Sequence, residues 1–132
     1  MDYGDEGRIT ECPVYVRVDF GGCNSAELAA VYRAFAALCL DRDVSRALLK
    51  AGDEDPRGHY GLRVALSTIA RRAAIRPDFK LALIPSTRPI EAVYREAQQH
   101  LRAAGFNAWV FGSETEALDW LEDRSVGGRT AS

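Results

Sequence analysis

Apolar side chains follow two different periods along this chain, and the two periods predict strands that alternate with helices. Residues 13–20 carry an apolar side chain at every second position, which is typical of a strand with one buried face. Residues 44–50 contain a short run of consecutive apolar residues, which indicates a strand buried on both faces, as in a parallel sheet. Residues 79–84 and 107–111 predict a third and a fourth strand.

After each of these strands, apolar residues recur every three or four positions, which predicts four amphipathic helices. The first ends near residue 40, and Gly105 stops the third. Short polar side chains and prolines mark helix starts, because they cap or pre-form the first turn. In chain order, these start signals are Asn24 with Glu27, Asp55 with Pro56, the loop 85–89, and Ser113 with Glu116.

The predicted order is a strand followed by a helix, repeated four times. Such alternation favours an α/β domain with a largely parallel sheet and right-handed crossovers, with the helices in one layer or two. We expect four or five strands, because the residues before the first strand can add one at the edge. The predicted parts are an N-terminal arm or extra edge strand over 1–12, one α/β domain over 13–122 and a disordered tail over 123–132.

Composition narrows the classes of protein that fit this pattern. The chain has 132 residues, of which 47% are hydrophobic and 27% charged, as expected of one globular domain. Its net charge of −2 gives no electrostatic argument for nucleic-acid binding. It contains no apolar run near the ~20 residues of a membrane span, and its acidic start does not resemble a signal peptide. We therefore expect a cytoplasmic protein, and its many arginines and alanines are typical of a GC-rich bacterial genome.

The three cysteines give no sign of a disulfide framework or a zinc site, because their number is odd and no Cys-x-x-Cys spacing occurs. Cys39 lies in the apolar stripe of the first predicted helix, where packing explains it. Cys23 follows Gly21 and Gly22 at a predicted strand end, where a thiol can be exposed.

The last third of the chain has a distinctive pattern. A strand of sequence FNAWVF (106–111) precedes a short acidic cap and a helix of sequence SETEALDWL (113–121). This ending resembles that of SpoIIAA-like proteins, which belong to the broader STAS fold (sulfate transporter and anti-sigma-factor antagonist). The segment RALLK (46–50), followed by a loop and a helix containing RVAL (63–66), is similar to the middle of that family. The resemblance covers roughly residues 13–122.

The resemblance implies a mixed sheet with helices mostly on one side, and a small cytosolic binding or regulatory module. Anti-sigma antagonists of that family carry a phosphorylatable serine after an aspartate, at the start of the helix that follows the second central strand. This chain has DEDPRGHY (53–60) at that place, with no serine or threonine, and Ser67 and Thr68 lie too far into the helix. The phosphorylation switch is therefore expected to be missing.

Ligands of open parallel sheets bind beyond the carboxyl ends of the strands, where helix N-termini point. The loop at 53–55 offers carboxylates that suit Mg²⁺ or Ca²⁺, although helix capping by Asp55 explains it as well. An imidazole in the next turn is a possible general base, and two hydroxyls with a guanidinium can hold an anion. The candidate ligand-binding residues are Asp53, Asp55, His59, Ser86, Thr87 and Arg88.

These observations favour a non-enzymatic regulatory or protein-interaction module over an enzyme. No catalytic set, metal site or cofactor motif is recognisable in the sequence. We expect an unidentified protein partner, with a homodimer as one possibility. The alternative is a small protein or enzyme that binds an anion or metabolite through the strand-end loops. Lipid binding, as in SEC14-like domains of similar arrangement, would need a larger apolar cavity than a chain of this length provides.

Overall fold

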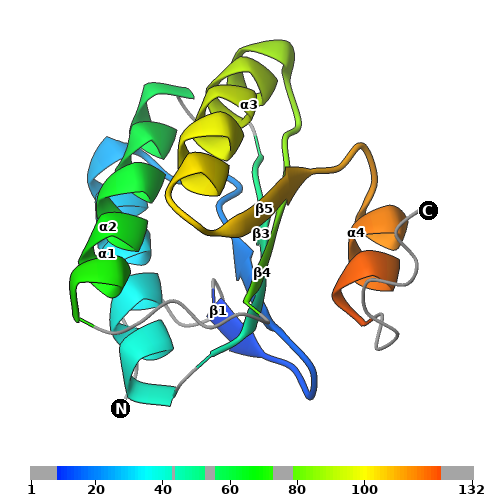
Figure 1. The fold of residues 1–132 in the computed structure, drawn as a ribbon. Coiled ribbons are helices and arrows are strands. Elements are labelled where there is room, and N and C mark those ends of the chain that lie inside the picture. The colour runs from blue at the N-terminus through cyan, green and yellow to red at the C-terminus, as the bar shows by residue number, and fades with distance from the viewer. Residues whose placement is uncertain (1–8, 43, 53–55, 73–78, 123–132) are drawn as a thin grey trace.

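The computed structural model describes residues 9–42, 44–52, 56–72 and 79–122, so the proposed tail and the carboxylates of 53–55 lie outside the described residues (Figure 1). Strands and helices alternate along the chain after an initial pair of strands. The elements are β1 (Ile9–Glu11), β2 (Val16–Asp19), α1 (Ser25–Arg42), β3 (Arg46–Lys50), the 3-10 helix η1 (Pro56–Tyr60), α2 (Gly61–Arg72), β4 (Lys80–Ile84), α3 (Arg88–Ala103), β5 (Asn107–Val110) and α4 (Glu114–Leu121).

The five strands form one mixed sheet in the order β1-β2-β3-β4-β5. Strand β1 is antiparallel to β2, and the other neighbours are parallel, with Val16 opposite Ala47 and Arg46 opposite Lys80. The protein is therefore an α/β domain whose parallel strands follow one another in chain order. Residues 9–11 form the edge strand β1, which is one of the two alternatives predicted for the N-terminal segment.

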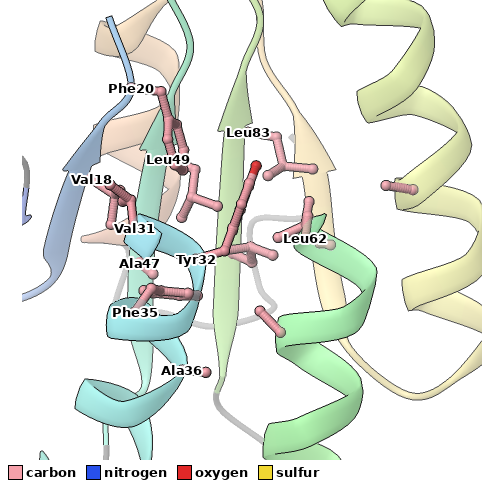
Figure 2. Close-up of a cluster of buried hydrophobic side chains, with 14 of the residues drawn as sticks. Val18, Phe20, Val31, Tyr32, Phe35, Ala36, Ala47, Leu49, Leu62 and Leu83 are labelled. Atoms are coloured by element: carbon pink, nitrogen blue, oxygen red, sulfur yellow. The ribbon is translucent and has the colours of Figure 1, made fainter. Parts of the chain in front are cut away.

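Helices α1, α2 and α3 cover one face of the sheet, and α4 lies against the other (Figure 1). The three-helix side holds the larger core, in which Val18, Phe35 and Leu49 are fully buried (Figure 2). The smaller core under α4 consists of Leu48, Ala82, Ile84, Ala117 and Leu121, flanked by partly buried aromatic side chains.

Strand β3 confirms the prediction of burial on both faces, since Ala47, Leu48 and Leu49 are all fully buried. Successive side chains of a strand point to opposite faces, so Ala47 and Leu49 enter the larger core and Leu48 the smaller. A strand of this kind requires cover on both sides, and α4 supplies the second cover.

Local capping explains where the helices begin. The side chain of Asn24 accepts a hydrogen bond from the Glu27 N–H, and Glu27 accepts one from the Asn24 N–H, both at 2.8 Å. Thr87 caps α3, and Ser113 caps α4 by accepting the Glu116 N–H at 3.2 Å. The predicted reciprocal cap at Asn24 and the predicted cap at Ser113 are confirmed.

The second helix differs from its prediction, because the segment that begins at Pro56 forms the 3-10 helix η1 before α2 starts at Gly61. A Cβ atom at Gly61 would lie 3.2 Å from Cδ2 of the Tyr32 ring, so glycine permits a close approach of α2 to α1. Among the described residues, none of the helices combines the length and the apolar character that a membrane span requires.

Truncation of Leu121 tests how far the domain depends on α4. Leu121 is fully buried against the sheet, so Leu121→Ala should lower the free energy of unfolding by about 3 kcal/mol through lost transfer energy and a residual cavity. Urea denaturation measures this change. Thr115→Ala, on an exposed position of the same helix, is the control and should change stability little. A loss below about 1 kcal/mol for Leu121→Ala would contradict a tightly packed α4.

Candidate functional site

The loop between β4 and α3 and the first residue of α3 carry three of the candidate residues, Ser86, Thr87 and Arg88, all exposed. The Ser86 hydroxyl donates to the Gly52 carbonyl and so brings this loop against the end of β3. The Thr87 hydroxyl accepts the Ile90 N–H at 3.4 Å and caps α3. Both hydroxyls therefore serve the fold, and Arg88 stands at the exposed start of α3 beside them. Asp53 and Asp55 lie outside the described residues.

His59 lies in the core rather than at the surface of these loops, with none of its area exposed. Its Nδ1 atom is 2.7 Å from the Tyr32 hydroxyl and 3.2 Å from the Tyr94 hydroxyl. Buried polar groups are stable only when they are hydrogen-bonded, and these contacts satisfy Nδ1 of the imidazole, with the Tyr32 hydroxyl as its nearer partner. The tautomer of His59 decides which atoms donate.

Aromatic rings surround the His59 imidazole. The Phe20 and Tyr94 ring centroids lie 5.0 and 5.1 Å from the centroid of the imidazole. Both rings are edge-to-face with it, which is an arrangement that aromatic pairs prefer. Phe20 follows β2, Tyr32 belongs to α1, His59 to η1 and Tyr94 to α3. We call these four residues the His59 cluster. It fastens η1, and with it the start of α2, to three other parts of the domain.

The sequence pointed to His59 but not to its surroundings. Tyr32 and Tyr94 occupy apolar positions of the α1 and α3 stripes, and a buried tyrosine needs a partner for its hydroxyl. The need of each tyrosine hydroxyl for a buried partner was therefore the only indication of this cluster in the sequence. Pairing the tyrosines with one histidine depends on how three helical segments pack, which no local pattern contains.

Two large apolar side chains stand on the solvent side of the same segment. Val64 is 68% exposed and Tyr60 is 46% exposed, at positions four residues apart where η1 passes into α2. We call them the Tyr60–Val64 surface. Tyr60 is the last residue of η1 and directly follows His59, and Val64 lies in the first turn of α2.

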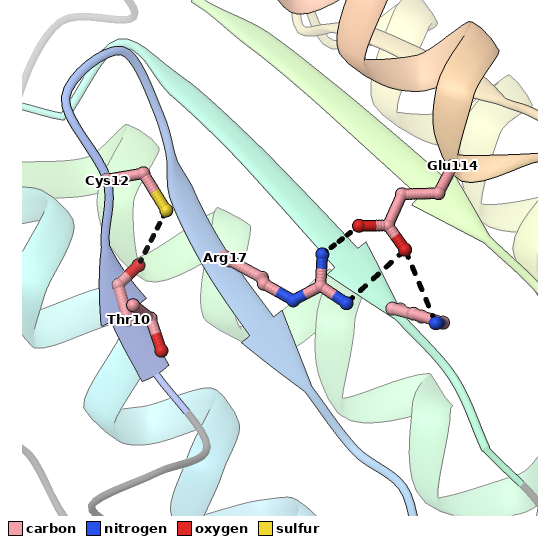
Figure 3. A network of polar contacts seen from close by, with 5 residues as sticks. Thr10, Cys12, Arg17 and Glu114 are labelled. Atoms are coloured by element: carbon pink, nitrogen blue, oxygen red, sulfur yellow. Dashed lines mark hydrogen bonds and ion pairs between the residues drawn. The ribbon is translucent and has the colours of Figure 1, made fainter.

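A second polar cluster fastens the start of α4 to the sheet (Figure 3). The Arg17 guanidinium on β2 donates to both carboxylate oxygens of Glu114, and the Lys50 ammonium on β3 lies 3.3 Å from Glu114 Oε1. The hydrogen bonds and charge of Arg17, with help from Lys50, hold the pKa of Glu114 below its usual value of 4.5. Glu114 in turn raises the pKa of Arg17.

The two buried cysteines, Cys23 and Cys39, offer no reactive centre. Cys39 is buried, and burial raises the pKa of its thiol to about 12. The expectation that Cys23 can be exposed is wrong, because its N–H bonds the Phe20 carbonyl at 3.1 Å and the chain turns the thiol into the core. Within the described ranges, histidine, cysteine and acidic side chains do not gather into a group that could hold a metal ion.

Comparison of the chain with protein-family models, with curated proteins and with solved structures finds no match.

Removal of the tyrosine hydroxyls tests the His59 cluster. Tyr32→Phe should cost about 1 kcal/mol of stability and Tyr94→Phe less, because the Tyr94 bond is longer. The double variant should cost more than the sum, since it removes both hydroxyl partners of Nδ1 at once. Chemical denaturation of the four proteins in a double-mutant cycle gives the coupling energy. Additive effects would show that the two hydroxyls do not share the imidazole.

Replacement of Glu114 tests the second cluster through pH. Because the pKa of Glu114 is lower in the folded than in the unfolded chain, its contribution is present above pH 4.5 and is lost as the pH falls through the folded value. Glu114→Gln should therefore lower stability at pH 7 by less than about 1 kcal/mol, as for a partly exposed ion pair. The difference between the two proteins should shrink as the pH falls below about 4. Parallel stability curves from pH 7 to about pH 3 would contradict this role.

Proposed function

We propose that this chain is a non-enzymatic protein-interaction module of the SpoIIAA-like class that works in the bacterial cytoplasm without a phosphorylation switch. It presents the Tyr60–Val64 surface to a protein partner. The observation that carries the proposal is the exposure of these two apolar side chains on a segment that the buried His59 cluster holds in place.

The arrangement of the fold supports this class. Four parallel strands in chain order, three crossover helices on one face and a final helix on the other agree with what the resemblance to SpoIIAA-like proteins implies. The C-terminal pattern that suggested the family serves packing, since Ala117 and Leu121 are buried and Trp120 contacts Phe111 at 5.2 Å between ring centroids.

The position of the surface supports an interaction role. Tyr60 and Val64 lie at the start of the helix that follows β3, which is the region where the resembled family places its phosphorylated serine. Among the described residues, two of the three exposed large apolar side chains lie on this short segment, and a concentration of exposed apolar surface in soluble proteins often marks a binding site. The side chains stand on a fixed backbone, so a partner would not have to order the segment before binding it.

The alternative, an anion bound at the strand-end loops, has less support. The Ser86 hydroxyl already donates to the Gly52 carbonyl, and the Thr87 hydroxyl already accepts the Ile90 N–H at the start of α3. An anion would then depend on Arg88 and on backbone N–H groups. Titration with inorganic phosphate distinguishes the two functions, since a rise in melting temperature that Arg88→Ala abolishes would favour the loop site.

Charge substitution on the Tyr60–Val64 surface tests the proposed function. Immobilised wild-type protein is used to capture a partner from a bacterial lysate, and the purified partner is then titrated against the variants. Val64→Asp should weaken binding at least ~10-fold, because it places a charge in the buried centre of the interface. The matched control is Thr115→Asp, which adds the same charge at an exposed position of α4 on the other side of the sheet.

Thr115→Asp should bind the partner as the wild type does. Equal affinity of Val64→Asp and wild type would overturn the assignment of this surface. Failure of the wild type to retain any partner across lysates would overturn the interaction role itself. Circular dichroism and melting temperature confirm that both variants are folded.

A further inference from the structure

A pocket opens at the amino ends of the parallel strands, at the opposite end of the sheet from the strand-end loops. Its volume is about 380 Å³, within the range of small-molecule sites, and it lies between the segment before β2, the start of β3 and the end of α4. The lining residues are Pro13, Val14, Arg46, Leu121 and Glu122.

Arg46 is the cation of this pocket, and its hydrogen bonding is incomplete. By the strand alternation, Arg46 shares the α4 side of β3 with Leu48. The Arg46 Nε atom is buried and has no hydrogen-bond acceptor among the residues that the structure describes. A buried donor without an acceptor is unfavourable, so an anionic group that accepted the Nε–H would relieve a cost already present in the fold.

Lys80, the cation next to Arg46 in the sheet, does not compete for an anionic ligand. Lys80 lies opposite Arg46 in the register of β3 and β4. Its ammonium donates to the Trp120 carbonyl at 2.8 Å and lies 5.1 Å from the centre of the Trp120 ring. Lys80 is therefore committed to the last turn of α4, which it holds against the sheet, and the guanidinium of Arg46 remains for a ligand.

The rest of the pocket contains the opposite charge and an apolar wall. Glu122 is the C-cap of α4, so its carboxylate adds to the negative end of the helix dipole. This charge would repel a simple anion and attract an ammonium group. Pro13 and Val14 provide accessible apolar surface in the same pocket, and Leu121 lies buried behind it. The pocket therefore combines a cation, an anion and a hydrophobic wall within one small volume.

We propose that this pocket binds an apolar α-amino acid. Arg46 holds the carboxylate, Glu122 with the end of α4 holds the ammonium group, and Pro13 and Val14 contact the side chain. A plain carboxylate would leave Glu122 opposed to it, and a plain amine would leave Arg46 without an acceptor. The pocket lies on the other side of the sheet from the Tyr60–Val64 surface, so the proposal does not depend on the proposed function.

Titration of the whole chain with L-leucine, followed by two-dimensional NMR, tests the proposal. At roughly 10 mM leucine, a site with a dissociation constant of about 1 mM is nearly saturated. Peaks of residues that line the pocket should shift. Isocaproate, which lacks the ammonium group, and isoamylamine, which lacks the carboxylate, should each bind at least ~10-fold more weakly.

Variants assign the binding to the pocket. Arg46→Gln should weaken leucine binding at least ~10-fold, because the amide retains hydrogen-bonding groups but loses the charge. Arg33→Gln is the matched control, since it makes the same change at an exposed position of α1 and should leave binding unchanged. Absence of leucine-dependent shifts in the wild type, equal binding of all three compounds, or full binding by a folded Arg46→Gln would each overturn the proposal.

Discussion

The imidazole of His59, hydrogen-bonded to two tyrosine hydroxyls, is the interaction on which the arrangement of the three-helix face depends. It links η1 to α1 and α3, and its ring packs on Phe20 at the end of β2. A polar ring in the core is costly unless it is hydrogen-bonded, so the tyrosine hydroxyls at Nδ1 stabilise η1 in this position. Gly61 completes this constraint by letting α2 approach the Tyr32 ring closely. The position of the exposed Tyr60–Val64 surface follows from these contacts.

The second face of the sheet obeys a separate constraint. Strands β3 and β4 carry apolar side chains on both faces, and α4 covers the second face over Leu48, Ala82 and Ile84. Charged groups hold this helix at both ends, with Arg17 and Lys50 on Glu114 at its start and Lys80 on the Trp120 carbonyl at its end. These contacts also shape the pocket beside Arg46, because they place Leu121 and Glu122 over the start of β3.

Local features of the sequence predicted much of this fold. The reciprocal cap of Asn24 and Glu27 and the cap at Ser113 depend on residues three apart, so they can be recognised without tertiary information. The apolar run in β3 correctly predicted burial on both faces. The 3-10 geometry of η1 was not predictable, because it depends on the fit of His59 between two other helices.

The candidate sites were harder to predict for the same reason. The link between Arg17 and Glu114 joins residues 97 positions apart, and the pocket beside Arg46 brings together three separate segments. The general rule for parallel sheets directed attention to the carboxyl ends of the strands, whereas this pocket lies at their amino ends. His59 was recognised as a residue of interest, but its burial and its tyrosine partners belong to the tertiary structure.

Amide hydrogen exchange of the wild type and of the Tyr32→Phe/Tyr94→Phe double variant tests most directly whether the His59 cluster holds the segment that carries the proposed interaction surface. If it does, amides of η1 and of the first turn of α2 will exchange faster in the double variant. Amides of β3 and β4 should keep most of their protection, because local opening of one unit leaves the central strands folded. Unchanged exchange in η1, or a uniform loss of protection over the whole domain, would contradict this account.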